Sequence, residues 1–168
     1  MIVAIMSDVH DNLWHLARML REVALAEALV YCGDFCAPFT LDELASHFAQ
    51  RIYAVFGNND GDKLLMSTVA SRHRNVTILG DFGEITLGGR LVAVTHTPQI
   101  AKALAAGGRY DLVCSGHTHK DKVEQVGNTL WVNPGEVMGR FGEACSALYD
   151  TEKHAVEFCR LAVTPVEW

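Results

Sequence analysis

Short apolar runs recur along this chain, and most of them end at a small group of polar residues. These runs predict strands over residues 1–7, 28–32, 51–56, 76–79, 83–87, 90–95, 110–114, 122–126, 129–132, 144–149 and 154–162. Between them, apolar side chains recur every three or four positions, which predicts helices over residues 12–26, 40–49, 61–73 and 98–107. Strand and helix alternate in the first half and strands dominate the second. The pattern therefore predicts an α/β layered sandwich with mixed sheets.

Turn and cap signals mark several ends of these elements. Asn12 is predicted to cap the first helix, and Thr40, followed three residues later by Glu43, fits a capping box for the second. The glycine pair at 88–89 predicts a tight hairpin turn between two strands. No repeat, linker or low-complexity segment divides the pattern, so residues 1–168 are predicted to form a single domain.

Polar clusters follow five of the predicted strands. These clusters are Asp8-Val9-His10, Gly33-Asp34, Gly57-Asn58-Asn59-Asp60, His96 and Gly116-His117-Thr118-His119. In open α/β sheets, ligand sites form beyond the carboxyl ends of the strands, where distant parts of the sequence meet. Carboxylate, imidazole and amide groups all bind divalent metal ions. The sequence therefore predicts a metal centre at the carboxyl edge of the strands.

The spacing within the clusters suits this hypothesis. Asp8 and His10 are two residues apart, as are His117 and His119, and just past a strand end both members of a pair can turn toward one ion. The glycine before Asp34 lets the backbone bend, so that this carboxylate can project across the strand ends and bridge two cations. Each signal alone is weak, because polar residues after strands more often make turn hydrogen bonds. The other histidines are predicted to be surface or structural residues: His15, His47, His73 and His154.

Composition is typical of a globular protein in water and restricts the partners. Of the 168 residues, 49% are hydrophobic and 20% charged, and 20 acidic residues against 14 basic ones give a net charge of −6. Because there is no run of Lys and Arg, duplex nucleic acid is not an expected partner. A small anionic substrate stays compatible, since bound cations supply positive charge locally. No apolar stretch is long enough to predict a membrane span.

The amino-terminal residues and the cysteines indicate a cytoplasmic protein. The apolar start lacks a basic leader and a cleavage site, so it is not predicted to be a signal peptide. The five cysteines are odd in number and lie mostly in apolar runs, which predicts reduced, buried thiols. The pair Cys32 and Cys36 has a poor spacing for a zinc finger, so packing is favoured over metal or redox chemistry.

The ordered motifs D-x-H, G-D, G-N-x-D, H and G-H-x-H resemble those of the calcineurin-like metallophosphoesterase superfamily. The short length, and the run Asn133-Pro134-Gly135, resemble its small archaeal and bacterial phosphodiesterase branch, which includes the YfcE-like proteins. The matching motifs extend over nearly the whole chain. The resemblance implies a four-layer αββα sandwich with two mixed sheets and a two-metal site at the carboxyl edge of the strands.

Carried over position by position, the resemblance implies two divalent cations that share Asp34. It assigns the first cation to Asp8, His10, Asp34 and His119. It assigns the second cation to Asp34, Asn58, His96 and His117. These thiolate-free donors suit manganese, with nickel, iron, zinc or cobalt as alternatives, better than calcium. A metal-bound hydroxide would then attack phosphorus in line, so no side-chain nucleophile is needed.

The chain departs from the family pattern at a position that matters for catalysis. Asn59 stands where the superfamily usually has a histidine that protonates the leaving alkoxide, and an amide cannot titrate. We therefore expect weak activity on monoesters with poor leaving groups and better activity on diesters or activated esters. Asp60 is a second candidate for the acid, although hydrogen bonding to the ligand loop is the favoured role.

Other departures and candidate substrate contacts lie near the motifs. Thr97 and Glu136 stand where glycine and serine are usual, and Glu136 would repel a phosphate if it faced the site. Asn12, Asn59 and Arg140 are candidate contacts for the substrate, and an exposed structural role is equally compatible with Arg140.

A phosphodiesterase is favoured over three alternatives. A protein-interaction scaffold of the same fold, as in a retromer subunit, is disfavoured because all seven inferred ligand positions hold metal-binding residues. A phosphomonoesterase is disfavoured by Asn59, and a mononuclear hydrolase of other bonds would leave half of the ligands unexplained. The physiological substrate, the native metal and the oligomeric state, including a homodimer, stay open.

Overall fold

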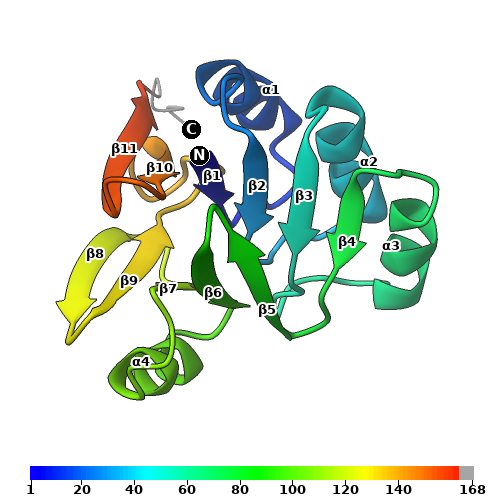
Figure 1. Ribbon diagram of the computed structural model, residues 1–168. Coiled ribbons are helices and arrows are strands. Elements are labelled where there is room, and N and C mark those ends of the chain that lie inside the picture. The colour runs from blue at the N-terminus through cyan, green and yellow to red at the C-terminus, as the bar shows by residue number, and fades with distance from the viewer. Residues whose placement is uncertain (163–168) are drawn as a thin grey trace.

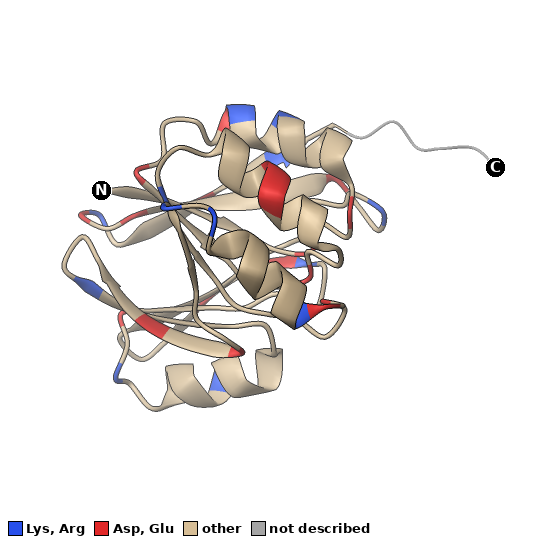
Figure 2. Ribbon diagram, turned by 90° about the vertical axis from the view of Figure 1, so that its right-hand side faces the viewer, with Lys and Arg blue, Asp and Glu red and all other residues tan. Residues whose placement is uncertain are grey.

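The computed structural model describes residues 1–162; the predicted domain also includes residues 163–168, which lie outside the described part. Two β-sheets lie face to face, with helices outside each of them (Figures 1 and 2). Three helices pack on one sheet and one helix on the other. This arrangement confirms the expected four-layer αββα sandwich.

The first sheet carries six strands in the order β11-β10-β1-β2-β3-β4. Its strands β1 to β4 pair in parallel, and β10 and β11 run antiparallel at one side. The bounds of these strands are β1 Ile2–Met6, β2 Ala28–Tyr31, β3 Arg51–Ala54, β4 Val76–Ile78, β10 Ala144–Asp150 and β11 Ala155–Leu161.

The second sheet carries five strands in the order β5-β6-β7-β9-β8. Strands β6, β7 and β9 pair in parallel, while β5 and β8 are antiparallel edge strands, so both sheets are mixed as predicted. The bounds are β5 Phe82–Leu87, β6 Arg90–Thr95, β7 Leu112–Cys114, β8 Asp121–Val126 and β9 Thr129–Pro134.

All four predicted helices are present; three are shorter than predicted, and the second has the predicted length but begins two residues earlier. They are α1 Leu13–Glu22, α2 Pro38–His47, α3 Lys63–Ala70 and α4 Pro98–Ala106. Within residues 1–162, no helix has the length and apolar character needed to cross a membrane.

The cap of α1 is confirmed, and the capping box predicted for α2 is wrong. Asn12 caps α1 by accepting the N–H of His15 at 3.1 Å. Helix α2 begins two residues before Thr40, at Pro38, because a proline fits the first helical turn, where no N–H donor is needed. Thr40 is therefore the third residue of α2 rather than its cap, and its hydroxyl donates to Asp11 Oδ1 at 2.5 Å.

Alternate residues of the buried strands face two different cores. In β1, Ala4 and Met6 face the helices α1 to α3, whereas Val3 and Ile5 face the second sheet. A third core lies between the second sheet and α4. Because both faces of β1 are covered, its sequence is continuously apolar rather than alternating. All five cysteines are free; three are buried, and Cys36 and Cys159 are partly exposed.

Candidate metal centre

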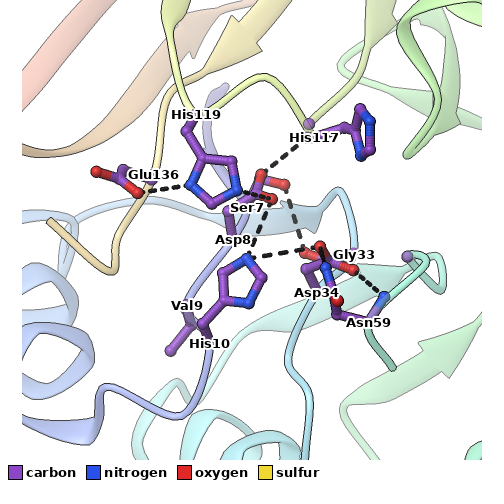
Figure 3. Close-up of polar contacts among 12 residues, drawn as sticks. Ser7, Asp8, Val9, His10, Gly33, Asp34, Asn59, His117, His119 and Glu136 are labelled. Atoms are coloured by element: carbon purple, nitrogen blue, oxygen red, sulfur yellow. Dashed lines mark hydrogen bonds and ion pairs between the residues drawn. The ribbon is translucent and has the colours of Figure 1, made fainter. Parts of the chain in front are cut away.

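The five polar clusters meet at the carboxyl ends of β1, β2, β3, β6 and β7, and Figure 3 shows Asp8, His10, Asp34 and His119 facing one another. Backbone hydrogen bonds hold the loops together. The N–H of Asp8 donates to the carbonyl of Gly33 at 3.0 Å, and the N–H of His10 donates to that of Asp34 at 3.2 Å. The N–H of Gly116 donates to the carbonyl of His96 at 3.2 Å. Both sheets therefore contribute to one site.

The first donor cluster joins Asp8, His10, Asp34 and His119. Asp8 Oδ1 lies 3.6 Å from His10 Nε2 and 3.3 Å from His119 Nε2. His10 Nε2 lies 3.5 Å from Asp34 Oδ2. Ligand atoms about 2.1 Å from a common cation lie roughly 3.0–3.4 Å from one another, so this spacing suits a small divalent ion. The four residues are the set predicted for the first metal.

Two atoms of this cluster are buried and unpaired. Among the residues that the structure describes, Asp8 Oδ1 and His10 Nε2 are buried with no hydrogen-bond partner. The other carboxylate oxygen of Asp8 accepts the N–H of His117 at 3.0 Å. An unsatisfied buried polar atom is costly, and a carboxylate oxygen more so. The donor set therefore fits a cation at the point that these atoms face.

The second donor cluster joins Asp34, Asn58, His96 and His117. Asn58 Oδ1 lies 2.9 Å from His96 Nε2 and 2.7 Å from His117 Nδ1. Asp34 Oδ2 lies 3.4 Å from His96 Nε2. The Nδ1 atom of His96 is 2.7 Å from the carbonyl oxygen of Cys32, so this nitrogen carries the proton and Nε2 is left as an acceptor. Asp34 thus lies between the two clusters.

The pKa shifts indicate a strongly negative site. Burial raises the pKa of Asp34, but the adjacent imidazole of His96 and the hydrogen bonds from Asn59 outweigh it and hold that pKa well below its usual value. The adjacent carboxylate of Asp8, together with the charge of Asp34, raises the pKa of His10 despite its burial. Burial lowers the pKa of His96, and the carboxylate of Asp34 more than reverses this effect. Excess negative charge in a buried site favours cations.

The ligand loops also carry unusual backbone conformations. Among the described residues, positive φ is adopted by eight non-glycine residues, and the only one outside the ligand loops is His154. Such conformations cost about 1–3 kcal/mol each and cluster at functional sites. The seven in the ligand loops are Asp8, His10, Asp11, Asp34, Cys36, His117 and His119.

Asp60 anchors the ligand loops through their backbone. Its buried carboxylate accepts the N–H of Gly57 at 2.7 Å, of Cys36 at 2.9 Å and of Asp34 at 3.2 Å. These bonds use both carboxylate oxygens, which supports the hydrogen-bonding role over that of a general acid.

Asn133 braces the histidine loop from the end of β9. Its amide donates to the carbonyl of Gly116 at 2.6 Å and to the hydroxyl of Thr118 at 3.0 Å. The run Asn133-Pro134-Gly135 thus contributes to the site by fixing the loop between the two histidines. Its place beside that loop depends on the pairing of β9 with β7.

Two side chains beside the site were not predicted to contact it. Cys36 Sγ lies 3.2 Å from His10 Nδ1, and Glu136 Oε2 lies 2.6 Å from His119 Nδ1. Each therefore holds the far side of an imidazole whose Nε2 points into the first cluster. Burial raises the pKa of the Cys36 thiol to about 12, so it stays protonated. The sequence predicted only a packing role for Cys36. It did not predict the contact with His10, because helix α1 lies between the two residues along the chain.

The candidate substrate contacts differ in their distance from the donors. The exposed Asn59 donates its amide N–H to Asp34 Oδ2 at 2.8 Å and its backbone N–H to Asp34 Oδ1 at 2.8 Å. The amide of Asn12 is instead engaged with the carbonyl of Met138 at 2.9 Å. The guanidinium of the exposed Arg140 lies 5.7 Å from the ring of Phe141.

Thr97 needs no glycine-like conformation. Its φ of −83° and ψ of 118° are open to any residue, and it precedes the first residue of α4. Nothing in the local backbone therefore requires the glycine that is usual at this position.

A side chain at Gly57 would displace the central carboxylate. A Cβ there would lie 2.1 Å from Asp34 Oδ1 and 2.6 Å from the backbone nitrogen of Asp34. We expect Gly57→Ala to lower the free energy of unfolding by about 1–3 kcal/mol, as overpacking typically does, measured by denaturant titration. Gly61→Ala is the matched control, because its nearest neighbour would be 3.5 Å away. Equal stability of the two variants would contradict the contact.

Comparison with known proteins agrees with this geometry. Residues 1–154 match the calcineurin-like phosphoesterase superfamily domain. The chain is 31% identical over 158 residues to phosphodiesterase MJ0936 of Methanocaldococcus jannaschii, covering 91% of this chain and 95% of that protein. The structure of a novel archaeal phosphodiesterase is 29% identical with a TM-score of 0.88, covering 96% of this chain and all of that one. The fold is also that of the YfcE phosphoesterase of E. coli, 20% identical with a TM-score of 0.66 over 98% of this chain and all of that one. By its matched domain, its relative and its fold, this chain belongs to the calcineurin-like phosphoesterase superfamily.

Proposed function

We propose that this chain is a divalent-metal-dependent phosphodiesterase, acting on small phosphodiesters with two cations that share Asp34. The observation that carries the proposal is the convergence of six other donor residues around the carboxylate of Asp34, with Asp8 Oδ1 and His10 Nε2 buried and unpaired beside it. The activity named for the 31% identical relative supports the choice of phosphodiesters.

Each cation would have its own set of ligands. Asp8, His10, Asp34 and His119 would hold the first, and Asp34, Asn58, His96 and His117 the second. Imidazole, carboxylate and amide donors without thiolate favour manganese, with nickel, iron, zinc or cobalt as alternatives. When bound, two such cations supply positive charge that lowers the pKa of water and stabilises charge developing on phosphoryl oxygens.

The residues around the cations would orient the ligands and the substrate, and would not themselves take part in bond making or breaking. The imidazoles of His10 and His96 are oriented by Cys36 and by the carbonyl of Cys32, which directs their Nε2 atoms inward. Asn59 offers an amide N–H for a phosphoryl oxygen but no titratable proton for a leaving alkoxide. This chemistry favours diesters and activated esters over alkyl monoesters, and it disfavours the phosphomonoesterase alternative. The complete donor set likewise favours catalysis over a scaffold role.

The five free cysteines support a reducing, cytoplasmic location, which we include in the proposal. A homodimer remains a proposal from the sequence, to be examined by sedimentation.

A hydrolysis panel tests the proposed function. Protein stripped by a chelator is expected to lose activity on bis-p-nitrophenyl phosphate and to regain it with Mn²⁺, because the donors alone provide no nucleophile. The panel includes p-nitrophenyl phosphate and cyclic nucleotides, each with Mn²⁺, Ni²⁺, Zn²⁺ and Co²⁺. Activity that persists unchanged after removal of metal, or its absence with every metal, would overturn the proposal.

A further inference from the structure

Glu136 is a buried carboxylate with two specific contacts. Its side chain is 1% exposed. The residue lies just after the end of β9, next to the site (Figure 3). One oxygen lies 2.6 Å from His119 Nδ1, and the other accepts the backbone N–H of Phe141 at 2.5 Å. The N–H of Met138 donates to the carbonyl of Asp8 at 3.0 Å, which holds this segment against the end of β1. Glu136 therefore faces the back of a ligand imidazole and not the open side of the site.

No lysine or arginine within residues 1–162 pairs with Glu136; its ion pair is with His119 alone. Burying an unpaired charge costs free energy of desolvation, so a positive charge near this carboxylate would stabilise it. The Nε2 atom of the same imidazole lies 3.3 Å from Asp8 Oδ1, in the first donor cluster. A cation in that cluster would supply the compensation through the ring.

We propose that Glu136 is a positioning residue that makes the first metal site much tighter than the second. It holds His119 with Nε2 directed at Asp8, as carboxylates behind metal-binding histidines do. The inference rests on the proposed function, because it concerns the same two cations.

The two sites differ in the charge that surrounds them. Asp8, Asp34 and, one imidazole further out, Glu136 bring three carboxylates to the first site. The second site has the shared Asp34 and otherwise neutral donors: Asn58, His96 and His117. Coulomb attraction to a divalent ion is therefore stronger at the first site. Loading should be sequential, with one tight and one weak ion.

Calorimetric titration of chelator-stripped protein with Mn²⁺ tests this inference. We expect wild-type protein to bind two ions with separate affinities. Glu136→Gln, which keeps the size and an acceptor but removes the charge, should weaken the tight site by about 10–100-fold and leave the weak site within about 3-fold. Glu136→Ser, whose shorter side chain withdraws the acceptor from His119 Nδ1, should weaken the tight site further. Glu143→Gln is the matched control, because this exposed residue of the same loop loses the same charge away from the donors.

A spectroscopic readout separates positioning from general support of the fold. The visible absorption of Co²⁺ at one equivalent should change in Glu136→Gln and stay unchanged in Glu143→Gln. If wild-type protein binds two ions but Glu136→Gln and Glu136→Ser bind them as wild type does, the inference is overturned while the proposed function stands. Equal weakening of both sites would also overturn it. Wild-type protein that binds no ion would overturn the proposed function itself.

Discussion

Replacing Asp34 by alanine should abolish almost all hydrolysis of bis-p-nitrophenyl phosphate, with a fall in kcat/KM of at least about 1,000-fold. The carboxylate faces both donor clusters, 3.5 Å from His10 Nε2 and 3.4 Å from His96 Nε2. Its loss would remove a ligand from both proposed cations at once, and with it several kcal/mol of charge stabilisation. The measurement is steady-state hydrolysis with saturating Mn²⁺, together with the number of ions bound.

Asp81→Ala provides the matched control for this variant. It also removes one carboxylate, but its side chain is 80% exposed and forms a surface pair with Lys63. Such a pair contributes little to stability, so Asp81→Ala should retain wild-type activity. Circular dichroism would verify that both variants are folded. Activity of Asp34→Ala within about tenfold of the control would show that Asp34 is not the shared ligand.

Introducing histidine at position 59 should change which leaving groups the protein accepts. Asn59 contacts Asp34 through both its amide and its backbone N–H, so its side chain is at the donor cluster and cannot supply a titrating proton. We expect Asn59→His to raise hydrolysis of an alkyl phosphate about 10–100-fold relative to p-nitrophenyl phosphate. The p-nitrophenolate leaving group needs no proton, whereas an alkoxide does.

Asn59→Gln is the control for this substitution, because it keeps the amide and adds no titratable group. Its ratio of alkyl to activated ester hydrolysis should equal that of the wild type. The ratio in Asn59→His should also depend on pH, since its imidazole must be protonated to act as an acid. An unchanged ratio in Asn59→His would remove the explanation offered for the preference for diesters.

Much of the fold follows from local patterns. The continuous apolar runs and the helical spacing predicted every strand and helix in order. A helix or strand that is buried on one or both of its faces has apolar residues at regular positions, and these can be read from the sequence. Ends were predicted less well. The capping box predicted for Thr40 and Glu43 was wrong because α2 already begins at Pro38, which places Thr40 inside the first helical turn.

The sequence by itself determined the candidate donor residues, because each lies directly after an apolar strand and their types and order carry the family motifs. Only the tertiary structure decided how the remaining side chains support them. Asp60 anchors three loop amides, Cys36 contacts His10, and Glu136 turns toward His119 instead of facing a phosphate. Apart from the bond between Gly57 and Asp60, which are three residues apart, these contacts join residues 17 to 26 positions apart. Their directions depend on strand pairing and on backbone angles in the loops, and neither leaves a periodic signal along the chain.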